Sequence, residues 1–241
     1  MMKLIAIILI MLVTTLAGLE LVTARLGPSG AAGEAPAPER FDYVVRDDFF
    51  AGLRGDAARL SRAMKVCEEI LAKNPRHAEA LVWHGAALLV QARGAFERGD
   101  RDGARTLSTR GVGEMEAAVA MAPADVGVLV PRGAVLSGAA RAVRDPDRAA
   151  AFMRTAVGDY EKAVAVQGPS FAQLSEHARG ELLGGLADGW YRLGNEERAR
   201  GYLTRLAAEL PGSTYADAAR QWLEHTPLRG GPGLTCMGCH E

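Results

Sequence analysis

The sequence predicts an all-helical fold. Of its 241 residues, 49% are hydrophobic and only 6% aromatic, and the chain is rich in Ala, Leu, Arg and Glu, which favour helices. The Val/Ile/Thr alternation that strands need is almost missing. Pro and Gly instead separate long stretches with helical spacing of apolar residues. We therefore expect helices throughout the folded part of the chain.

The charge pattern excludes some classes of function. The formal net charge is −1, and acidic and basic residues alternate without forming a basic stripe. Such a surface does not attract a phosphate backbone, so we expect no nucleic-acid partner. No Ser/His/Asp set, helical carboxylate pair or phosphate-binding Gly loop stands out in the sequence. We therefore predict that the chain is not an enzyme.

Residues 1–24 have the features of an export signal. Lys3 precedes an uncharged apolar run from Leu4 to Leu19, and small residues follow at 22–24, as signal peptidase prefers. Glu20 interrupts this cleavage region. The length of the apolar run is close to the minimum for a permanent transmembrane helix. A cleaved signal peptide and an uncleaved anchor in the inner membrane both stay open. Either one places the bulk of the chain outside the cytoplasm, in the periplasm or exported.

A linker separates this segment from the folded body. Residues 25–40 include GPSGAAGEAPAPE, a Pro/Gly/Ala-rich stretch that favours an extended, solvated chain. A helical pattern then runs over 41–53 and breaks at Gly55. Asp56 is placed to cap a second helix that reaches Lys73, and Pro75 stops it.

The next stretch, NPRHAEALVWHGAALL, resembles the junction between two tetratricopeptide repeats. In that family a helix ends at a Pro, and the following helix carries a large, a small and a large residue at set spacings. Leu81, Gly85 and Leu88 occupy those positions here. The small residue lets the two helices of one hairpin approach closely.

The stretch LADGWYRLGNEERARGYLTRLAAELP matches the repeat signature best. Its matching residues are Leu186, Ala187, Trp190, Gly194, Ala199, Leu203 and Pro211. Two looser units end near Pro123 and Pro169 and exceed the family's period of about 34 residues. Their first helices are therefore extended, or their turns hold insertions, namely ARGAFERGDRDGART and AVRDPDRAA. A last helix over 214–224 resembles the solvating cap of such stacks.

The resemblance implies a solenoid of stacked antiparallel hairpins over 41–225, with a protein partner in its groove. A four-helix or six-helix bundle is the alternative, because the same apolar periodicity suits both. Cys67 is expected to be a buried packing thiol. Trp83, Trp190 and Trp222 are expected to pack between helices.

The tail 226–241 contains Cys236-Met237-Gly238-Cys239-His240, which carries the most specific chemistry in the sequence. Two thiols at this spacing can each bond a haem vinyl group, and the adjacent His can bind the iron as proximal ligand. In this pentapeptide alone the chain resembles c-type cytochromes, which implies covalent haem c. The predicted export signal is consistent with haem c, since covalent haem attachment of this kind occurs on the exported side of bacterial membranes.

Two other interpretations of the motif stay open. Cys236 and Cys239 could form a disulfide or a redox pair, which gives His240 no role. With His240 they could instead provide three zinc ligands, and the fourth would come from elsewhere.

The opposite axial position of the iron is also open. Only Glu241 follows His240, so we expect that ligand to come from the folded body, from a partner, or to be absent. His225 and His177 are the candidates, although a lone His is more often a surface or packing residue. The stretch TPLRGGPGLT is a flexible tether of about 10 residues that reaches at most about 33 Å.

Three functions follow from these features. The first is an exported repeat scaffold whose tail haem exchanges electrons with a docked protein. The second is a haem-free periplasmic interaction or assembly module with a structural or redox-active Cys pair. The third, a haem enzyme or gas sensor, requires an open iron position in a protected pocket.

Overall fold

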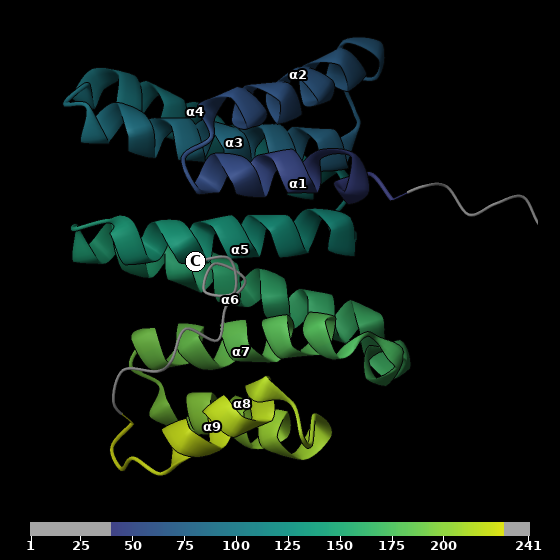
Figure 1. Cartoon of the computed structure of the whole chain (residues 1–241), viewed down its shortest axis with the longest axis vertical. Coiled ribbons are helices and arrows are strands. Elements are labelled where there is room, and N and C mark those ends of the chain that lie inside the picture. The colour runs from purple at the N-terminus through teal and green to yellow at the C-terminus, as the bar shows by residue number, and fades with distance from the viewer. Residues whose placement is uncertain (1–39, 229–241) are drawn as a thin grey trace, which may run out of the picture. The chain divides into compact units, whose positions relative to one another are not determined.

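The structure is a computed structural model that describes residues 40–228. The predicted signal segment 1–24, the linker as far as residue 39 and the motif at 236–240 lie outside the described residues. Within 40–228 there are helices and no strand, which confirms the all-helical prediction for this part of the chain (Figure 1). The elements are α1 (Asp42–Leu53), α2 (Ala57–Lys73), α3 (Ala78–Glu97), α4 (Arg101–Met121), α5 (Val126–Ala142), α6 (Pro146–Gln167), the 3₁₀-helix η1 (Gly168–Gln173), α7 (Glu176–Arg192), α8 (Glu196–Glu209) and α9 (Thr214–Leu223).

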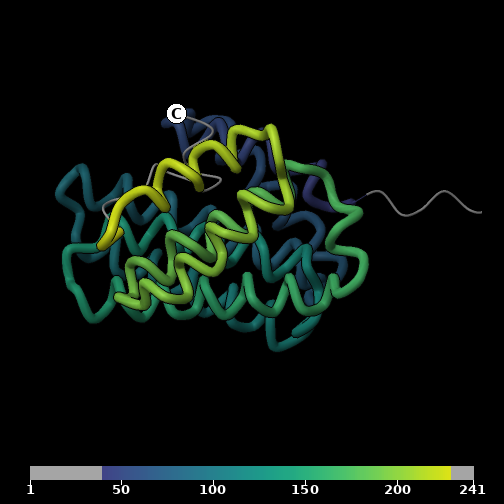
Figure 2. The backbone as a smooth tube through the Cα atoms, turned by 90° about the horizontal axis from the view of Figure 1, so that it is seen from below, coloured from purple at the N-terminus to yellow at the C-terminus, as the bar shows by residue number. Residues whose placement is uncertain are grey.

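Helices that follow one another in the chain pack side by side as hairpins. The pairs are α1 with α2, α3 with α4, α5 with α6 and α7 with α8 (Figure 1). Helix α3 also contacts α1 and α5, and α5 contacts α7. Helix α9 packs against α8 and touches α7 at the C-terminal end of this body (Figure 2). Neighbouring hairpins are thus joined through their first helices as well as through the chain.

Three of the hairpin turns share one backbone design. Gly55, Gly99 and Gly194 each have positive φ, of 103°, 85° and 77°. The next residue donates its N–H to a carbonyl five positions back, at 2.9–3.0 Å, which is the helix-ending bond of a Schellman motif. Its side chain then accepts an N–H of the new helix, at 3.0 Å for Asp56. Residues with a Cβ are strained at this φ, so glycine is required there.

The turns between hairpins share a different design. After α2, α4 and α8 the chain continues through Pro75, Pro123 and Pro211, each one residue past the C-cap. Two residues after each Pro, an N–H closes the turn onto the C-cap carbonyl at 3.1–3.2 Å. That same residue caps the next helix with its side chain, as Asp125 does. The α6–α7 connection departs from this pattern, because η1 lengthens it.

The long units arise from extended helices, not from inserted loops. Helices α3 and α4 contain 20 and 21 residues, and Arg98–Asp100 form a tight turn between them. The stretch ARGAFERGDRDGART is therefore helix, turn and helix. Likewise Asp145 caps α6, and Pro146 stands at its first position, where no N–H is needed.

Two groups of buried apolar side chains form the core. One is built mainly from α1 to α5 and the other mainly from α5 to α9, and Val119 and Phe152 pack against both. Trp83 and Trp222 are buried as expected, and Cys67 is 1% exposed. Trp190 is half-buried and donates its indole N–H to Glu161 at 3.0 Å.

Candidate functional site

The motif residues Cys236, Cys239 and His240 lie outside the described residues. The part of the chain that the structure describes therefore bears on the site in two ways. It fixes the point from which the tail leaves the body, and it gives the surroundings of the two candidate distal ligands, His177 and His225.

The tail leaves the body beside the first turn of α8. Arg200 donates from Nη2 to the carbonyl oxygen of His225 at 2.5 Å and to Oγ1 of Thr226 at 3.1 Å. The backbone N–H of Leu228 donates to Oε1 of Glu196 at 3.1 Å, and the Leu228 side chain is buried. The hydrogen bonds from Arg200 and Leu228 lower the pKa of Glu196. Residues 225–228 are thus held on α8.

His225 is exposed just beyond the end of α9. Its backbone N–H and carbonyl both form hydrogen bonds, to Trp222 and Arg200. Its imidazole forms no hydrogen bond with any residue of 40–228. Nothing in the described residues fixes the orientation of this ring.

His177 has a more structured environment at the start of α7. Its Nδ1 lies 2.9 Å from the Tyr215 hydroxyl, and that hydroxyl donates to Oε1 of Glu181 at 3.0 Å. Tyr215 comes from the first turn of α9, where the side chain of Ser213 caps the helix. Gly180 makes room for the Tyr215 ring, because a Cβ on Gly180 would lie 2.5 Å from three of its carbons.

The two histidines lie at opposite ends of the α7–α9 pair. The beginnings of these helices meet where Tyr215 contacts His177, and their ends meet where the rings of Tyr191 and Trp222 are 5.2 Å apart. His177 is at the first of these ends and His225 at the second. The structure therefore does not bring the two candidates together.

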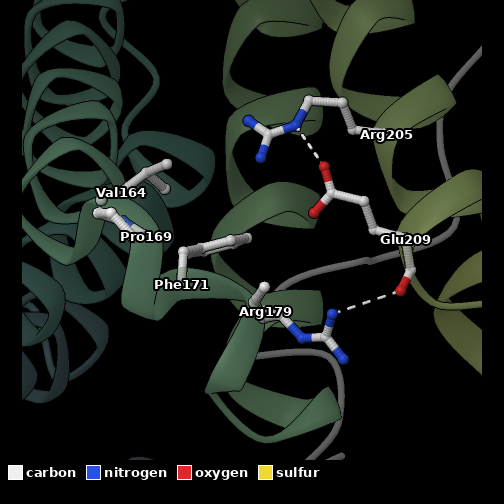
Figure 3. Close-up of a pocket in the computed structure, with 8 residues that line it drawn as sticks. Val164, Pro169, Phe171, Arg179, Arg205 and Glu209 are labelled. Carbon is white, nitrogen blue, oxygen red and sulfur yellow. Dashed lines mark hydrogen bonds and ion pairs between the residues drawn. The ribbon is translucent and has the colours of Figure 1, made fainter.

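A surface pocket lies on α6, η1, α7 and α8 (Figure 3). It has a volume of about 440 Å³, and Phe171 forms its apolar wall. Arg205 lies over the Phe171 ring and donates to Oε1 of Glu209 at 2.8 Å. Arg179 reaches the Glu209 carbonyl at 3.4 Å, and its buried Nε has no hydrogen-bond partner in the described part of the chain. The pocket is therefore polar on one side and carries two guanidinium groups.

Sequence reasoning missed the charged groups buried between helices. Arg132 of α5 donates twice to Asp159 of α6, at 2.7 and 2.6 Å, and both side chains are largely buried. Burial raises the pKa of Asp159, and Arg132 opposes that shift. Asp188 of α7 accepts from Arg141 of α5 and from Arg192. These pairs join helices within and between hairpins.

His84 is also buried, at 2% exposure, and its Nδ1 lies 2.5 Å from Oε2 of Glu114. Burial opposes ionisation of Glu114, but the hydrogen bonds from His84 and Arg110 outweigh it and lower the pKa of this carboxyl. Burial raises the pKa of the Cys67 thiol to about 12. The contact between His84 and Glu114 joins α3 to α4.

Among residues 40–228, no three His, Cys, Asp or Glu side chains converge in a way that could hold a metal ion. None of the helices in this range combines the length and the apolar character needed to cross a bilayer. Comparison with known protein families, curated protein sequences and solved structures finds no match to the chain.

Proposed function

We propose that the chain is an exported helical-repeat scaffold of the tetratricopeptide type that carries a covalently bound haem c on its C-terminal tail. The haem exchanges electrons with a protein that docks on the repeats. Cys236 and Cys239 hold the haem, and His240 binds its iron.

The repeat part of this proposal is supported by two kinds of turn that recur in phase. A Gly with positive φ followed by an Asp or Asn cap separates the helices of three hairpins, and a Pro turn follows three of the four hairpins. A bundle does not require its turns to alternate in this way. A stack of equivalent hairpins does, because each unit repeats the same supersecondary structure.

The contacts between first helices support a docking face for a partner. Helix α3 touches α1 and α5, and α5 touches α7, so the first helices of successive hairpins are neighbours. In a stacked-hairpin protein these helices line one continuous face, which is where such proteins bind peptides and proteins. The partner is therefore proposed to lie across α1, α3, α5 and α7.

The haem part rests on a single observation, the spacing of Cys236, Cys239 and His240 in the sequence. Each thiol S–H adds across one vinyl double bond, so two thioethers form and no group leaves. His240 follows directly and provides an imidazole nitrogen for the iron. Bound in this way, the haem supplies a one-electron couple at the end of the tail.

The test is expression of the full chain in a bacterial periplasm together with the haem-maturation machinery. We expect a red protein whose haem stays on the polypeptide after denaturation and electrophoresis. A Cys236→Ala/Cys239→Ala chain should be colourless under the same conditions. Colourless wild-type protein with two titratable or disulfide-linked thiols would refute the haem proposal and favour the haem-free interaction module.

A further inference from the structure

We infer that the surface pocket on α6, η1, α7 and α8 binds a small organic monocarboxylate with an apolar body, and that Arg179 is the cation that holds the carboxylate. This inference goes beyond the function proposed above. It involves no residue of the tail and requires no haem, so it can be tested and can fail independently of the haem proposal.

The pocket lies where the repeat pattern is interrupted. The connection between α6 and α7 departs from the Pro turn that follows α2, α4 and α8, because η1 lengthens it. Four of the eight residues that line the pocket belong to η1, among them Pro169 and Phe171. The other four come from α6, α7 and α8. The extra segment therefore builds one wall of a cavity of about 440 Å³.

The walls of this pocket differ in chemistry (Figure 3). Val164 and Pro169 line one side, and Phe171 lies between Arg205 and Arg179 in this view. The Arg205 guanidinium is 5.6 Å from the centroid of the Phe171 ring. A ligand in the cavity therefore meets apolar side chains and guanidinium groups at the same time.

The charges of the lining residues favour a single negative charge on the ligand. Arg205 donates from Nε to Oε1 of Glu209 at 2.8 Å, so these two charges offset each other. Arg179 forms no ion pair with any Asp or Glu of residues 40–228. One positive charge is therefore left over. Guanidinium groups bind carboxylates and phosphates best. A phosphomonoester carries about −1.5 to −2 charges, so a monocarboxylate matches this lining better.

The N–H groups of Arg179 are mostly without acceptors. Its Nη1 reaches the carbonyl oxygen of Glu209 at 3.4 Å, which is long for a hydrogen bond, and its buried Nε has no hydrogen-bond partner in the described part of the chain. By contrast, Arg132 donates from Nε and Nη2 to Asp159 at 2.7 and 2.6 Å. Buried donors are rarely unpaired in folded proteins. A ligand carboxylate would supply acceptors that Arg179 does not find in residues 40–228.

The apolar side of the pocket selects for more than a carboxylate. A cavity of about 440 Å³ is much larger than one carboxylate group, and the remaining space adjoins Val164, Pro169 and Phe171. Burial of apolar ligand surface against such side chains adds to affinity in proportion to its area. A ring with one acidic arm, such as phenylacetate, combines both features and serves as the probe.

The first test uses the wild-type full-length chain and three ligands. Calorimetric titration compares phenylacetate, its neutral analogue phenylacetamide, and acetate. We expect phenylacetate to bind about tenfold more tightly than either control, because phenylacetamide lacks the charge and acetate lacks the apolar body. If phenylacetate does not bind, or binds no more tightly than either control, the inference is wrong.

The second test locates the site with two arginine variants. Arg179→Gln should weaken phenylacetate binding about 10- to 100-fold, the range expected for loss of a hydrogen-bonded charge. Arg154→Gln makes the same change in net charge at an exposed residue of α6 that does not line the pocket. It should change the affinity less than about twofold, because distant exposed charges are screened. Equal losses in the two variants would overturn the assignment to Arg179.

A third measurement needs no substitution and therefore holds even if Arg179→Gln does not fold. In nitrogen-15 spectra of the wild-type chain, the Nε–H signal of Arg179 should move as phenylacetate is added, while that of Arg154 stays in place. If phenylacetate binds and the Arg179 signal does not move, the ligand binds elsewhere and the inference is refuted.

Discussion

Gly85 of α3 and Gly111 of α4 meet backbone to backbone. A Cβ on either glycine would lie 2.6 Å from the carbonyl oxygen of the other. On Gly111 it would also lie 2.6 Å from Cδ1 of Leu89. Helices α3 and α4 can therefore pack at this distance only because neither residue has a side chain.

Gly111→Ala should consequently destabilise the fold. The added methyl group has to displace backbone atoms, and overpacking of this kind costs about 1–3 kcal/mol. Urea unfolding followed by circular dichroism measures the change. The control is Gly113→Ala two positions away, where a Cβ meets nothing within 4 Å. That change should stabilise the protein by about 0.5–1 kcal/mol, because Ala favours helix. Equal effects of the two substitutions would contradict the close approach.

The His84–Glu114 contact should make stability depend on acidity. The pKa of Glu114 is lowered from 4.5 in the folded chain, so its contribution to stability is complete above pH 4.5 and is lost as pH falls through the folded pKa. The difference in unfolding free energy between wild type and Glu114→Gln should therefore be largest near neutral pH and shrink in acid. Glu116→Gln, on an exposed neighbour in α4, should show no such trend. If the difference in unfolding free energy between wild type and Glu114→Gln stays constant with pH, that result would argue against the contact.

Breaking the Arg132–Asp159 pair should be costly. The two side chains are only 12% and 4% exposed, so Asp159→Ala leaves a buried guanidinium without its partner. We expect a loss of about 3–5 kcal/mol, and partial recovery in an Arg132→Met/Asp159→Leu double variant. The exposed pair Arg93–Glu97 is the comparison, and Glu97→Ala there should cost less than about 1 kcal/mol. Chemical denaturation of these three variants and of wild type measures the losses, and a small effect of Asp159→Ala would mean that the pair does not hold α5 to α6.

Cys67 should be unreactive in the folded protein. Its thiol is buried and its pKa is about 12, so almost no thiolate exists at pH 8. Titration with an aromatic disulfide reagent should leave it unmodified until denaturant is added. Rapid modification in native protein, traced to Cys67 by peptide mass, would contradict this burial.

Local signals in the sequence were enough to predict much of the fold. Asp56 was expected to cap a helix that ends at Lys73, and α2 has these limits. The predicted helix over 214–224 is α9, which ends one residue earlier. Gly and Pro determine backbone geometry within a few residues, so such positions can be read without tertiary information.

The buried polar contacts could not be predicted in this way. Arg132 and Asp159 are 27 residues apart, and His84 and Glu114 are 30 apart. Which residues meet depends on how two helices are rotated and shifted against each other, and apolar periodicity does not fix this to one residue. The same holds for Tyr215, which contacts His177 from 38 positions away. Such contacts between residues far apart in the chain are therefore visible only in the tertiary structure.

The mass of the mature protein purified from a periplasm with haem-maturation activity tests the central proposal most directly. We expect the polypeptide mass increased by one haem, unchanged by denaturation and absent from the Cys236→Ala/Cys239→Ala chain. The same spectrum reports whether the segment 1–24 is removed. An unmodified polypeptide mass for wild type, from cells that load haem onto a control cytochrome, would contradict the proposal.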